Sequence, residues 1–435
     1  MATVDPTWPN SQRRSNQQLT SGAFFWLTAF YFVYCARPED WIPGLFYVPL
    51  AKITGLFVVL GLFSAAGSTA RKVKDLPREG HYFLALVLLL FASAAFSPVW
   101  KTGALWRTVN FGKAFIAFVL TYLLVTDFAK VRRIMFIQTA SVAAVAVVSI
   151  AKGYSTPRLQ GVLGGIYSNP NDLAFAIVLA LPFCLAFCVT AKTGVRKVAW
   201  LLAMLAMLAA IFLTASRAGF IDLVFAGAVC LWNFGIKGRR PFLIVSSLVL
   251  VILMLATVGG KLRDRFGALS GDTSDLDTRS AYGSYEARKY LMQRALEGIE
   301  HYPLLGIGAN NFVTYSQVWH EVHMTYLQIA VEGGIPALIL FILFFWRGFS
   351  NLATLRRRRD LDEETQLFVG ALHSSYIGFL VGACFAPEAY QFFPYFAVAH
   401  IAALLAVVKE HSRMAEPTRR YAPALSGAAQ SYAFD

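Results

Sequence analysis

Residues 198–236 read VAWLLAMLAMLAAIFLTASRAGFIDLVFAGAVCLWNFGI, and this stretch decides the fold. It consists of two apolar runs, 198–214 and 218–236, with almost nothing between them. Each run is close to the roughly 20 residues that an α-helix needs to cross the hydrocarbon core of a bilayer. The stretch therefore predicts two consecutive transmembrane helices, with Arg217 at or just below a membrane surface.

Apolar runs of similar length recur along the whole chain. Hydrophobic residues make up 57% of the 435 residues, charged residues make up 15%, and the mean hydropathy is +0.54, far above that of a soluble protein. We therefore predict an all-α polytopic integral membrane protein with about 12 transmembrane helices. The expected helices lie near 22–36, 45–66, 81–97, 108–126, 134–151, 172–191, 198–214, 218–236, 242–259, 325–346, 367–386 and 392–409.

The Lys and Arg residues between these runs predict the orientation, because basic residues resist translocation. With a cytoplasmic N-terminus, 24 of the 39 basic residues fall on the cytoplasmic side, 8 fall outside, and the remaining 7 lie in one long outer loop. Both termini are thus predicted to be cytoplasmic, and the first apolar run to be a retained helix. The expected segments are an N-terminal tail (1–21), helices 1–9 (22–259), a periplasmic loop (260–322), helices 10–12 (323–409) and a C-terminal tail (410–435).

The composition argues against several other classes. A net charge of +14 could indicate nucleic acid, but the basic residues form short clusters between apolar runs, as topology signals do. The five cysteines form no CxxC pair and do not alternate with His, so neither a disulfide framework nor a zinc site is expected. Asp275 and Asp277 resemble the paired carboxylates of metal-dependent glycosyltransferases, but their Ser/Asp/Gly-rich surroundings favour a solvated loop. We predict no metal and no cofactor.

The outer loop is predicted to contain an amphipathic helix at 284–300. Leu291, Ala295 and Ile299 recur at helical spacing, Ser284 could cap the start, and Pro303 follows the end. Such a helix can lie on the membrane surface and roof a cavity.

Arg217 is costly where it stands. An arginine at the centre of a transmembrane helix costs roughly 2.5–3.5 kcal/mol on translocon scales, and less near the interface, so it needs a partner or a polar cavity. An arginine that extends to lipid headgroups is an equally good interpretation. Residues 168–172 (SNPND) open the sixth helix, where Asn169 or Asn171 could cap it and free N–H groups could bind an anion. An ordinary cap-and-turn is the favoured interpretation of this signal.

A polar group stands where the outer loop re-enters the membrane. His320, Glu321 and His323 precede the tenth apolar run. A histidine at a wet boundary titrates near neutrality and can serve as a general base, although an interfacial histidine at a helix end would show the same pattern. Arg263 and Arg265 follow the ninth run, where positive charge could hold a phosphate or simply anchor the helix.

Taken in their order along the chain, these sequence motifs resemble those of the O-antigen ligase/polymerase superfamily of bacterial envelope proteins. The start at residues 37–41 (RPEDW) is also similar to members of this superfamily. The resemblance spans roughly residues 160–345. The matching stretches are residues 168–174 (SNPNDLA), 214–219 (TASRAG), 303–312 (PLLGIGANNF) and 323–336, with Leu327, Glu332 and Gly334 in place.

The resemblance implies a GT-C-like glycosyltransferase of the inner membrane that uses an undecaprenyl diphosphate-linked glycan on the periplasmic face. Arg217 matches the arginine of a TxSR motif, Arg265 with Leu269 matches an Arg-x3-Leu motif of ligase outer loops, and His323 matches the essential loop-end histidine. Many relatives have Asn after that histidine, where this chain has Met324. His323, Arg217 and Arg265 are therefore the predicted catalytic residues. The residues predicted to bind substrate are Asn169, Asn171, Asp172, Asn310, Asn311, His320 and Glu332.

Several functions remain open on sequence alone. A ligase would transfer the glycan to lipid A–core, and the Arg-x3-Leu match favours it over an O-antigen polymerase. A protein O-oligosaccharyltransferase is a third possibility. A secondary transporter or lipid flippase would also have twelve helices, but such proteins carry paired interrupted helices and buried ionisable residues, which are not evident here. Membrane lipids are expected partners and nucleic acid is not.

Overall fold

The computed structural model describes residues 8–64, 69, 71–153, 158–161, 166–167, 169–234, 276–318 and 320–420, with seven isolated positions between 245 and 260. Within these ranges, side chains are described for 20–412 apart from 276–285. All regular elements in the described ranges are helical. They are α1 (Trp8–Ala36), α2 (Pro38–Trp41), α3 (Leu50–Ser64), the 3₁₀ turn η1 (Val73–Asp75), α4 (Arg78–Ala95), α5 (Lys101–Leu124), α6 (Phe128–Gly153), α7 (Pro170–Thr190), α8 (Gly194–Thr214), α9 (Arg217–Phe234), α12 (Leu276–His301), α13 (Phe312–Tyr315), α14 (Thr325–Arg357), α15 (Glu363–Gly382) and α16 (Phe392–Arg420).

Apolar composition accounts for these helices. Seven described helices are long and apolar enough to cross a membrane, namely α4, α6, α7, α8, α9, α14 and α16, while α1 and α3 contribute shorter apolar segments. Eleven of the twelve predicted runs fall on described helices, and the ninth, 242–259, lies outside the described residues except for isolated positions. The prediction of an all-α polytopic membrane protein is therefore confirmed, whereas the number of twelve and the GT-C-like arrangement stay predictions.

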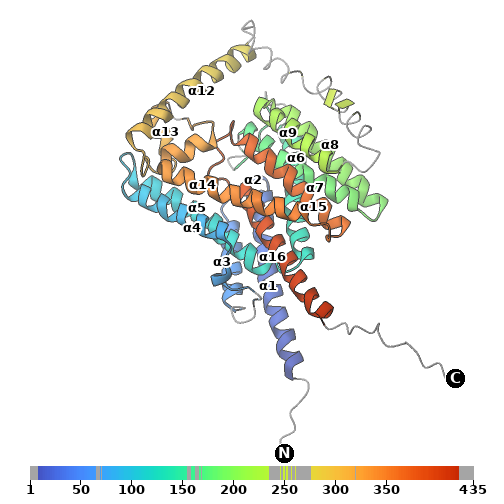
Figure 1. The fold of residues 1–435 in the computed structure, drawn as a ribbon. Helices are drawn as coiled ribbons and strands as arrows, with labels where there is room; N and C mark the ends of the chain where they lie inside the picture. Colours follow the sequence, from blue (N-terminus) through green and yellow to red (C-terminus); the bar gives the residue numbers. More distant parts are fainter. Residues whose placement is uncertain are drawn as a thin grey trace, which may run out of the picture.

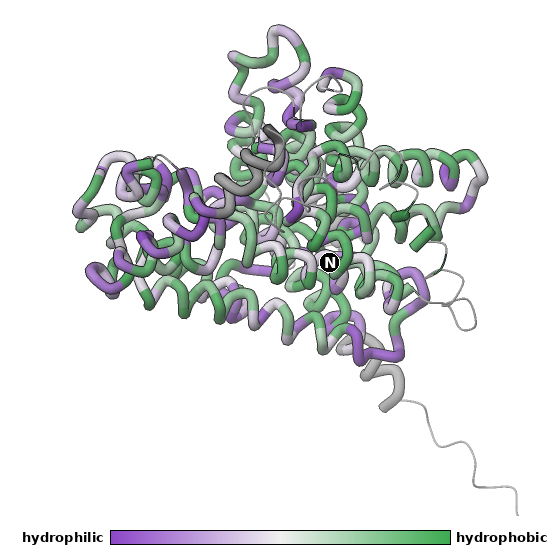
Figure 2. The backbone as a smooth tube through the Cα atoms, turned by 90° about the horizontal axis from the view of Figure 1, so that it is seen from above, coloured by the Kyte–Doolittle hydropathy of each residue, from purple (hydrophilic) through white to green (hydrophobic). Residues whose placement is uncertain are grey.

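The surface of the bundle is as apolar as its interior. Large side chains such as Leu88, Leu202 and Trp346 are more than half exposed, which a protein in water would avoid but lipid tails would cover. Figure 2 shows hydrophobic residues along most of the helices, with hydrophilic residues gathered mainly at the ends and connections. The interior is packed by aromatic rings, among them Phe83 and Tyr395, which stack at 4.7 Å between ring centroids.

The ends of the chain and helix α12 lie on opposite sides of the bundle. The start of α1 and the end of α16 project from the same side, and α12 runs across the far side (Figure 1). The termini thus share one side, as predicted, and their assignment to the cytoplasm stays a prediction. Helix α12 begins at Leu276, eight residues before the predicted start, so Ser284 lies inside the helix and cannot cap it. Gly283 does not stop the helix because a glycine costs only about 1 kcal/mol within one.

Residues 303–308, which follow α12, form a strap that closes a break in α14. Gly334 has φ 81° and ψ 172°, which interrupts the helix two residues before Pro336. The exposed backbone groups are satisfied by residues 303–308, since the Gly308 N–H donates to Glu332 O (2.9 Å) and the Ile335 N–H donates to Pro303 O (2.8 Å). Gly306 has φ 66°, and a Cβ there would lie 2.5 Å from the Glu332 carbonyl carbon. Gly306 and Gly334 are thus required because the two backbone segments approach each other closely.

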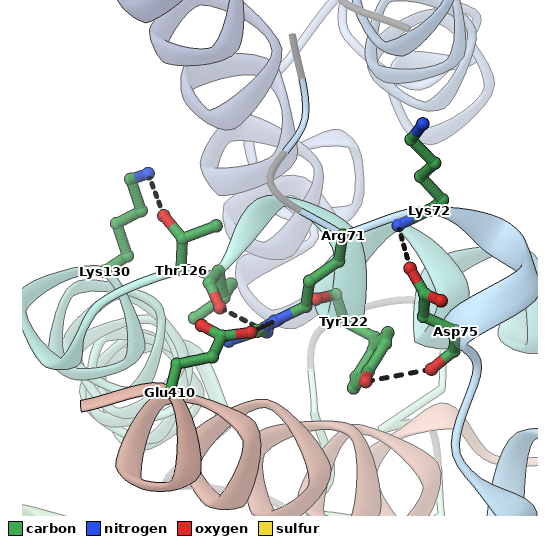
Figure 3. A network of polar contacts seen from close by, with 8 residues as sticks. Arg71, Lys72, Asp75, Tyr122, Thr126, Lys130 and Glu410 are labelled. Atoms are coloured by element: carbon green, nitrogen blue, oxygen red, sulfur yellow. Dashed lines mark hydrogen bonds and ion pairs between the residues drawn. The ribbon is translucent and has the colours of Figure 1, made fainter. Parts of the chain in front are cut away.

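The opposite end of the bundle is held by a buried arginine. Arg71 is 3% exposed and forms a two-point ion pair with Glu410 of α16, at 2.8 and 3.1 Å. Its Nη1 donates to the carbonyls of Tyr122 (2.8 Å) and Val125 (2.9 Å) at the end of α5. Figure 3 shows this network, in which Lys72 also contacts Asp75. Because the last carbonyls of a helix favour a cation, Arg71 caps α5 and fastens α16 to it.

Candidate active site

Those predicted site residues that the structure describes lie at the end of the bundle away from Arg71. Helices α7, α9 and α14 begin there, and the connection between α15 and α16 lies beside them. Hydrogen bonds join these parts: Ser216, just before α9, contacts α7, and the Thr325 N–H of α14 donates to Ala383 O (2.8 Å). The site is therefore built from segments that are far apart in the sequence.

Two of the predicted motifs are in direct contact. Asn169 caps α7, since its side chain accepts the Asn171 N–H at 3.0 Å. The Asn171 side-chain oxygen accepts hydrogen bonds from Ser216 Oγ (2.7 Å) and from Arg158 Nη2 (3.3 Å). Gly219 lets α9 approach α7, because a Cβ there would lie 2.5 Å from the Ala174 methyl. The two motifs thus fix one another and the start of α9.

Arg217 is the first residue of α9 and is half-buried. A helix N-terminus carries partial positive charge, so the helix dipole does not favour a cation there. The preceding Ala215 adopts a left-handed conformation (φ 49°), which forms the sharp turn from α8 into α9. An arginine at the start of a helix can bind an anion such as a phosphate.

His323 lies in the connection that leads into α14. Its Nδ1 is buried and has no hydrogen-bond partner within the described ranges. The pKa of His323 is lowered from 6.5 to about 4, mainly by burial and also by the positive charge of Arg288 on α12 and by the nearby His320. The imidazole is thus neutral at neutral pH, in the form that can accept a proton from a hydroxyl.

Glu321 interacts with Arg107, a residue that the sequence prediction did not place in the site. Burial raises the pKa of Glu321, and the Arg107 guanidinium opposes that rise. Arg107, from the start of α5, also lies over the Tyr390 ring at 5.4 Å. On sequence alone, Arg107 is only one of the eight basic residues that are predicted to fall outside. A charged residue next to a transmembrane run is expensive, and this was the signal that could have marked it.

Glu388 is a second residue that sequence reasoning missed. It lies between α15 and α16 and is 3% exposed. Its backbone is held in place, since the Glu388 N–H donates to Thr325 Oγ1 (3.0 Å), which in turn donates to Ala386 O (2.7 Å). Burial raises the pKa of Glu388 well above its usual value, and the nearby charges of Asp172, Glu321 and Asp222 add to this. A short acidic turn between two apolar runs was the available signal.

The residues between 303 and 336 that were predicted to bind substrate make structural contacts near the site. Asn311 is 1% exposed, and its side-chain nitrogen donates to Ser97 Oγ (2.8 Å), Trp100 O (3.1 Å) and Ile307 O (2.8 Å). Glu332 is also 1% exposed and accepts the Phe312 N–H at 3.3 Å. Asn310 adopts φ 62° in the turn before them. Their assignment as substrate-binding residues stays a prediction, and the Asn311 amide already serves to hold the strap against α4 and α5.

The structure thus brings together some of the predicted residues. Asn171 meets the Ser216–Arg217 turn, and Asp172 lies within electrostatic range of Glu321 and Glu388. Arg265 falls in 261–275, outside the described residues, as do Arg263 and Asp275. Across the described part of the chain, no three His, Cys, Asp or Glu residues are grouped closely enough to hold a metal ion.

These features define a class of protein: a polytopic, all-helical membrane protein with cations, carboxylates and a neutral histidine gathered at one end of its bundle. Comparison with known families makes the class more specific, because the family model described as O-Antigen ligase matches residues 202–342. The resemblance to the O-antigen ligase superfamily is therefore confirmed over this stretch, which contains Arg217 and His323. It points to a ligase or polymerase type of activity in a multi-pass inner-membrane protein.

Two other comparisons add no functional argument. The chain is similar to a solved structure titled "Structural coordination of polymerization and crosslinking by a peptidoglycan synthase complex", with 17% sequence identity and a TM-score of 0.40. That match covers 77% of this chain and 96% of the other. No match was found among curated proteins.

Proposed function

We propose that the protein is an O-antigen ligase that transfers a glycan from undecaprenyl diphosphate to a sugar hydroxyl of lipid A–core on the periplasmic face. The observation that carries this proposal is the neutral, half-buried His323, whose buried Nδ1 has no partner in the described structure and which lies within the stretch that matches the O-antigen ligase family. A transporter or flippase has no need of such a base.

The reaction requires a base and a cationic site. The acceptor hydroxyl oxygen attacks the anomeric carbon of the first donor sugar while its proton passes to the His323 imidazole. The bond from the anomeric carbon to the phosphate oxygen breaks, and its electron pair leaves with undecaprenyl diphosphate. Attack from the face opposite the leaving group inverts the anomeric centre. Proximity and the placed base together lower the barrier.

The leaving group carries its own activation, so the protein chiefly has to neutralise developing charge. We assign this task to Arg217 and to Arg265, whose guanidinium groups can each form two hydrogen bonds to phosphate oxygens. The positive end of the α9 helix dipole lies beside Arg217 and also favours an anion. Because these groups supply the positive charge, the proposed mechanism is metal-independent. The Asn171–Ser216 contact supports it by fixing the turn from which Arg217 projects.

The test is transfer by the purified protein in liposomes that contain lipid-linked glycan and lipid A–core. Ligase activity predicts long glycan attached to lipid A–core and free undecaprenyl diphosphate as the second product. Extension of the lipid-linked glycan without attachment would instead identify a polymerase. Accumulation of lipid-linked glycan on one side of sealed vesicles, with no glycan transferred, would refute both and indicate a transporter.

A further inference from the structure

The site contains more carboxylates than the proposed reaction uses. Glu321 precedes α14, Glu332 lies in α14, Glu388 precedes α16, and Asp172 lies in the first turn of α7. Charge interactions link Glu321 to Glu332, to Asp172 and to Glu388, so the four groups share one region. The proposed transfer assigns its base to His323 and its cations to arginines. Asp172 and Glu332 are predicted to bind substrate without a stated substrate group, and Glu321 and Glu388 have no assigned task.

Three buried polar groups in this region have no hydrogen-bond partner in the described part of the chain. They are Glu388 Oε1, Glu332 Oε2 and the Tyr390 hydroxyl, in side chains that are 3%, 1% and 6% exposed. The Tyr390 hydroxyl and the Glu332 carboxylate lie close enough to interact with one another, so Glu388 Oε1 is the group that most needs a donor from a ligand. A buried polar group without a partner costs about 1–3 kcal/mol, so native proteins rarely keep several in one place. A ligand that supplies hydroxyl or ammonium donors would satisfy all three.

The surrounding structure holds these groups rigidly. Besides the Thr325 contact to Glu388, the Ala389 N–H donates to Gln328 Oε1 (3.3 Å) and the Tyr395 hydroxyl donates to Ala389 O (2.7 Å). Glu332 is fixed by the strap through its own carbonyl, which accepts Ser93 Oγ at 2.8 Å. Preorganised groups of this kind are typical of binding sites, because little entropy is lost when the ligand arrives.

The charges in this region restrict the chemistry of the ligand. Burial raises the pKa values of Glu321 and Glu388, and repulsion from neighbouring carboxylates adds to the rise at Glu388, so negative charge is already costly there. A further carboxylate would add to this repulsion. Hydroxyl groups can donate to the unpartnered oxygens, and an ammonium group would also relieve the repulsion. The Arg107 guanidinium lies against Tyr390 and Glu321 and compensates part of the charge.

We propose that Glu321, Glu332, Glu388 and Tyr390 form the subsite for the acceptor sugar, and that this subsite accepts neutral or amino sugars and rejects uronic acids. The inference rests on the proposed transfer reaction and adds the class of its acceptor. The acceptor fits better than the donor for two reasons. Glu321 is two residues from His323, which takes the proton of the acceptor hydroxyl, and the anionic diphosphate belongs with Arg217 rather than with carboxylates.

The test compares three soluble acceptor probes, namely the benzyl glycosides of glucose, glucosamine and glucuronic acid, with lipid-linked glycan as donor in proteoliposomes. We expect transfer to the glucuronide to be at least about tenfold slower than to the glucoside, which corresponds to about 1.4 kcal/mol. Glu388→Gln removes the charge but keeps the shape of the side chain. It should reduce the ratio of the glucoside rate to the glucuronide rate by a similar factor and remove any advantage of the glucosaminide. Glu79→Gln is the matched control, because Glu79 is 1% exposed at the opposite end of the bundle and should leave the ratio unchanged.

Binding is measured separately, as the rise in thermal unfolding temperature that each glycoside produces. If wild-type protein transfers glycan but treats the three probes equally, the subsite proposal is overturned while the transfer reaction stands. If no probe receives glycan, yet the glucosaminide and glucoside stabilise the protein more than the glucuronide does, the subsite stands and the transfer reaction is in doubt. Equal stabilisation by all three overturns the subsite. Glu321→Gln serves as the second variant if Glu388→Gln does not fold.

Discussion

The two ends of the helical bundle treat their buried polar groups in opposite ways. At the end with the chain termini, Arg71 is engaged by Glu410 and two carbonyls, and Glu79 accepts Asn351 Nδ2 at 2.7 Å. At the other end, His323 Nδ1 and the free oxygens of Glu332 and Glu388 have no partner in the described structure. Buried polar groups stabilise a fold when they are paired and cost stability when they are not. The first end therefore serves stability, and the unpartnered groups at the second end support the proposed substrate site.

The largest effect should come from removing the proposed base. His323→Ala is expected to lower the rate of glycan transfer by about 10²- to 10⁴-fold, because a positioned general base contributes that much. Thermal stability should not fall, since the imidazole Nδ1 makes no hydrogen bond in the described structure. His301→Ala is the matched control, because His301 is exposed at the end of α12 and should be dispensable. A His323→Ala protein that transfers at near-normal rate would remove the contrast between the two ends.

Arg217→Lys should reduce the rate of transfer by about 10²- to 10³-fold. This is the usual effect of losing a hydrogen-bond donor that stabilises the charge developing in the transition state. Lysine keeps the charge but cannot form the two-point contact with a phosphate. The measurement is single-turnover transfer at several donor concentrations, which separates donor binding from the chemical step. Arg294→Lys on α12 provides the control, as Arg294 pairs with Glu297 and lies over the Tyr315 ring. Equal losses in both variants would argue against a specific role for Arg217.

Arg71→Ala should have the opposite outcome: lower stability with normal activity. We expect a loss of about 2 kcal/mol in the free energy of unfolding, because two carbonyls and the partly exposed Glu410 lose their partner. Unfolding is followed by denaturant titration in detergent, and transfer is normalised to the folded fraction. Lys72→Ala, at an exposed neighbour, should change neither quantity. A large drop in transfer per folded molecule would show that the two ends are coupled.

The smallest effect concerns pH. Because the pKa of His323 is lowered to about 4, its imidazole stays unprotonated as the pH falls from 7.5 to about 5. The base should be lost only as the pH drops through about 4, so the transfer rate should show no inflection near pH 6.5. The measurement is the single-turnover rate across this range, with donor saturating. An acid limb with a midpoint near 6.5 would show that His323 is exposed to water during the reaction.

Much of the fold could be read from the sequence. Apolar length marked eleven of the described helices because the bilayer imposes a fixed span, and Pro303 marked the end of α12. The start of α12 was wrong, since Ser284 looked like a cap but lies within the helix. Caps depend on weak local preferences, whereas bilayer spans depend on the sum of some twenty transfer energies, which is why the second kind of prediction is more secure.

Less of the candidate site could be read in this way. Arg217 and His323 were noticed because charge beside a membrane is expensive, and the order of the motifs gave them roles. Glu388 and Arg107 were missed because no local pattern distinguishes a charged residue near the end of an apolar run from one in a binding site. Their significance depends on Tyr390 and on Glu321, and these contacts join segments that are hundreds of residues apart.

By itself, then, the sequence determined the helical membrane class, the predicted orientation and the resemblance to a family, because these follow from hydropathy and from short motifs. Tertiary structure alone decided that Asn171 meets Ser216, that the strap from 303 to 308 closes the break at Gly334, and that the carboxylates gather beside Tyr390. Hydropathy acts on each segment independently, so it can be summed along the chain. Hydrogen bonds and charge interactions act between segments, and they exist only once the helices have packed.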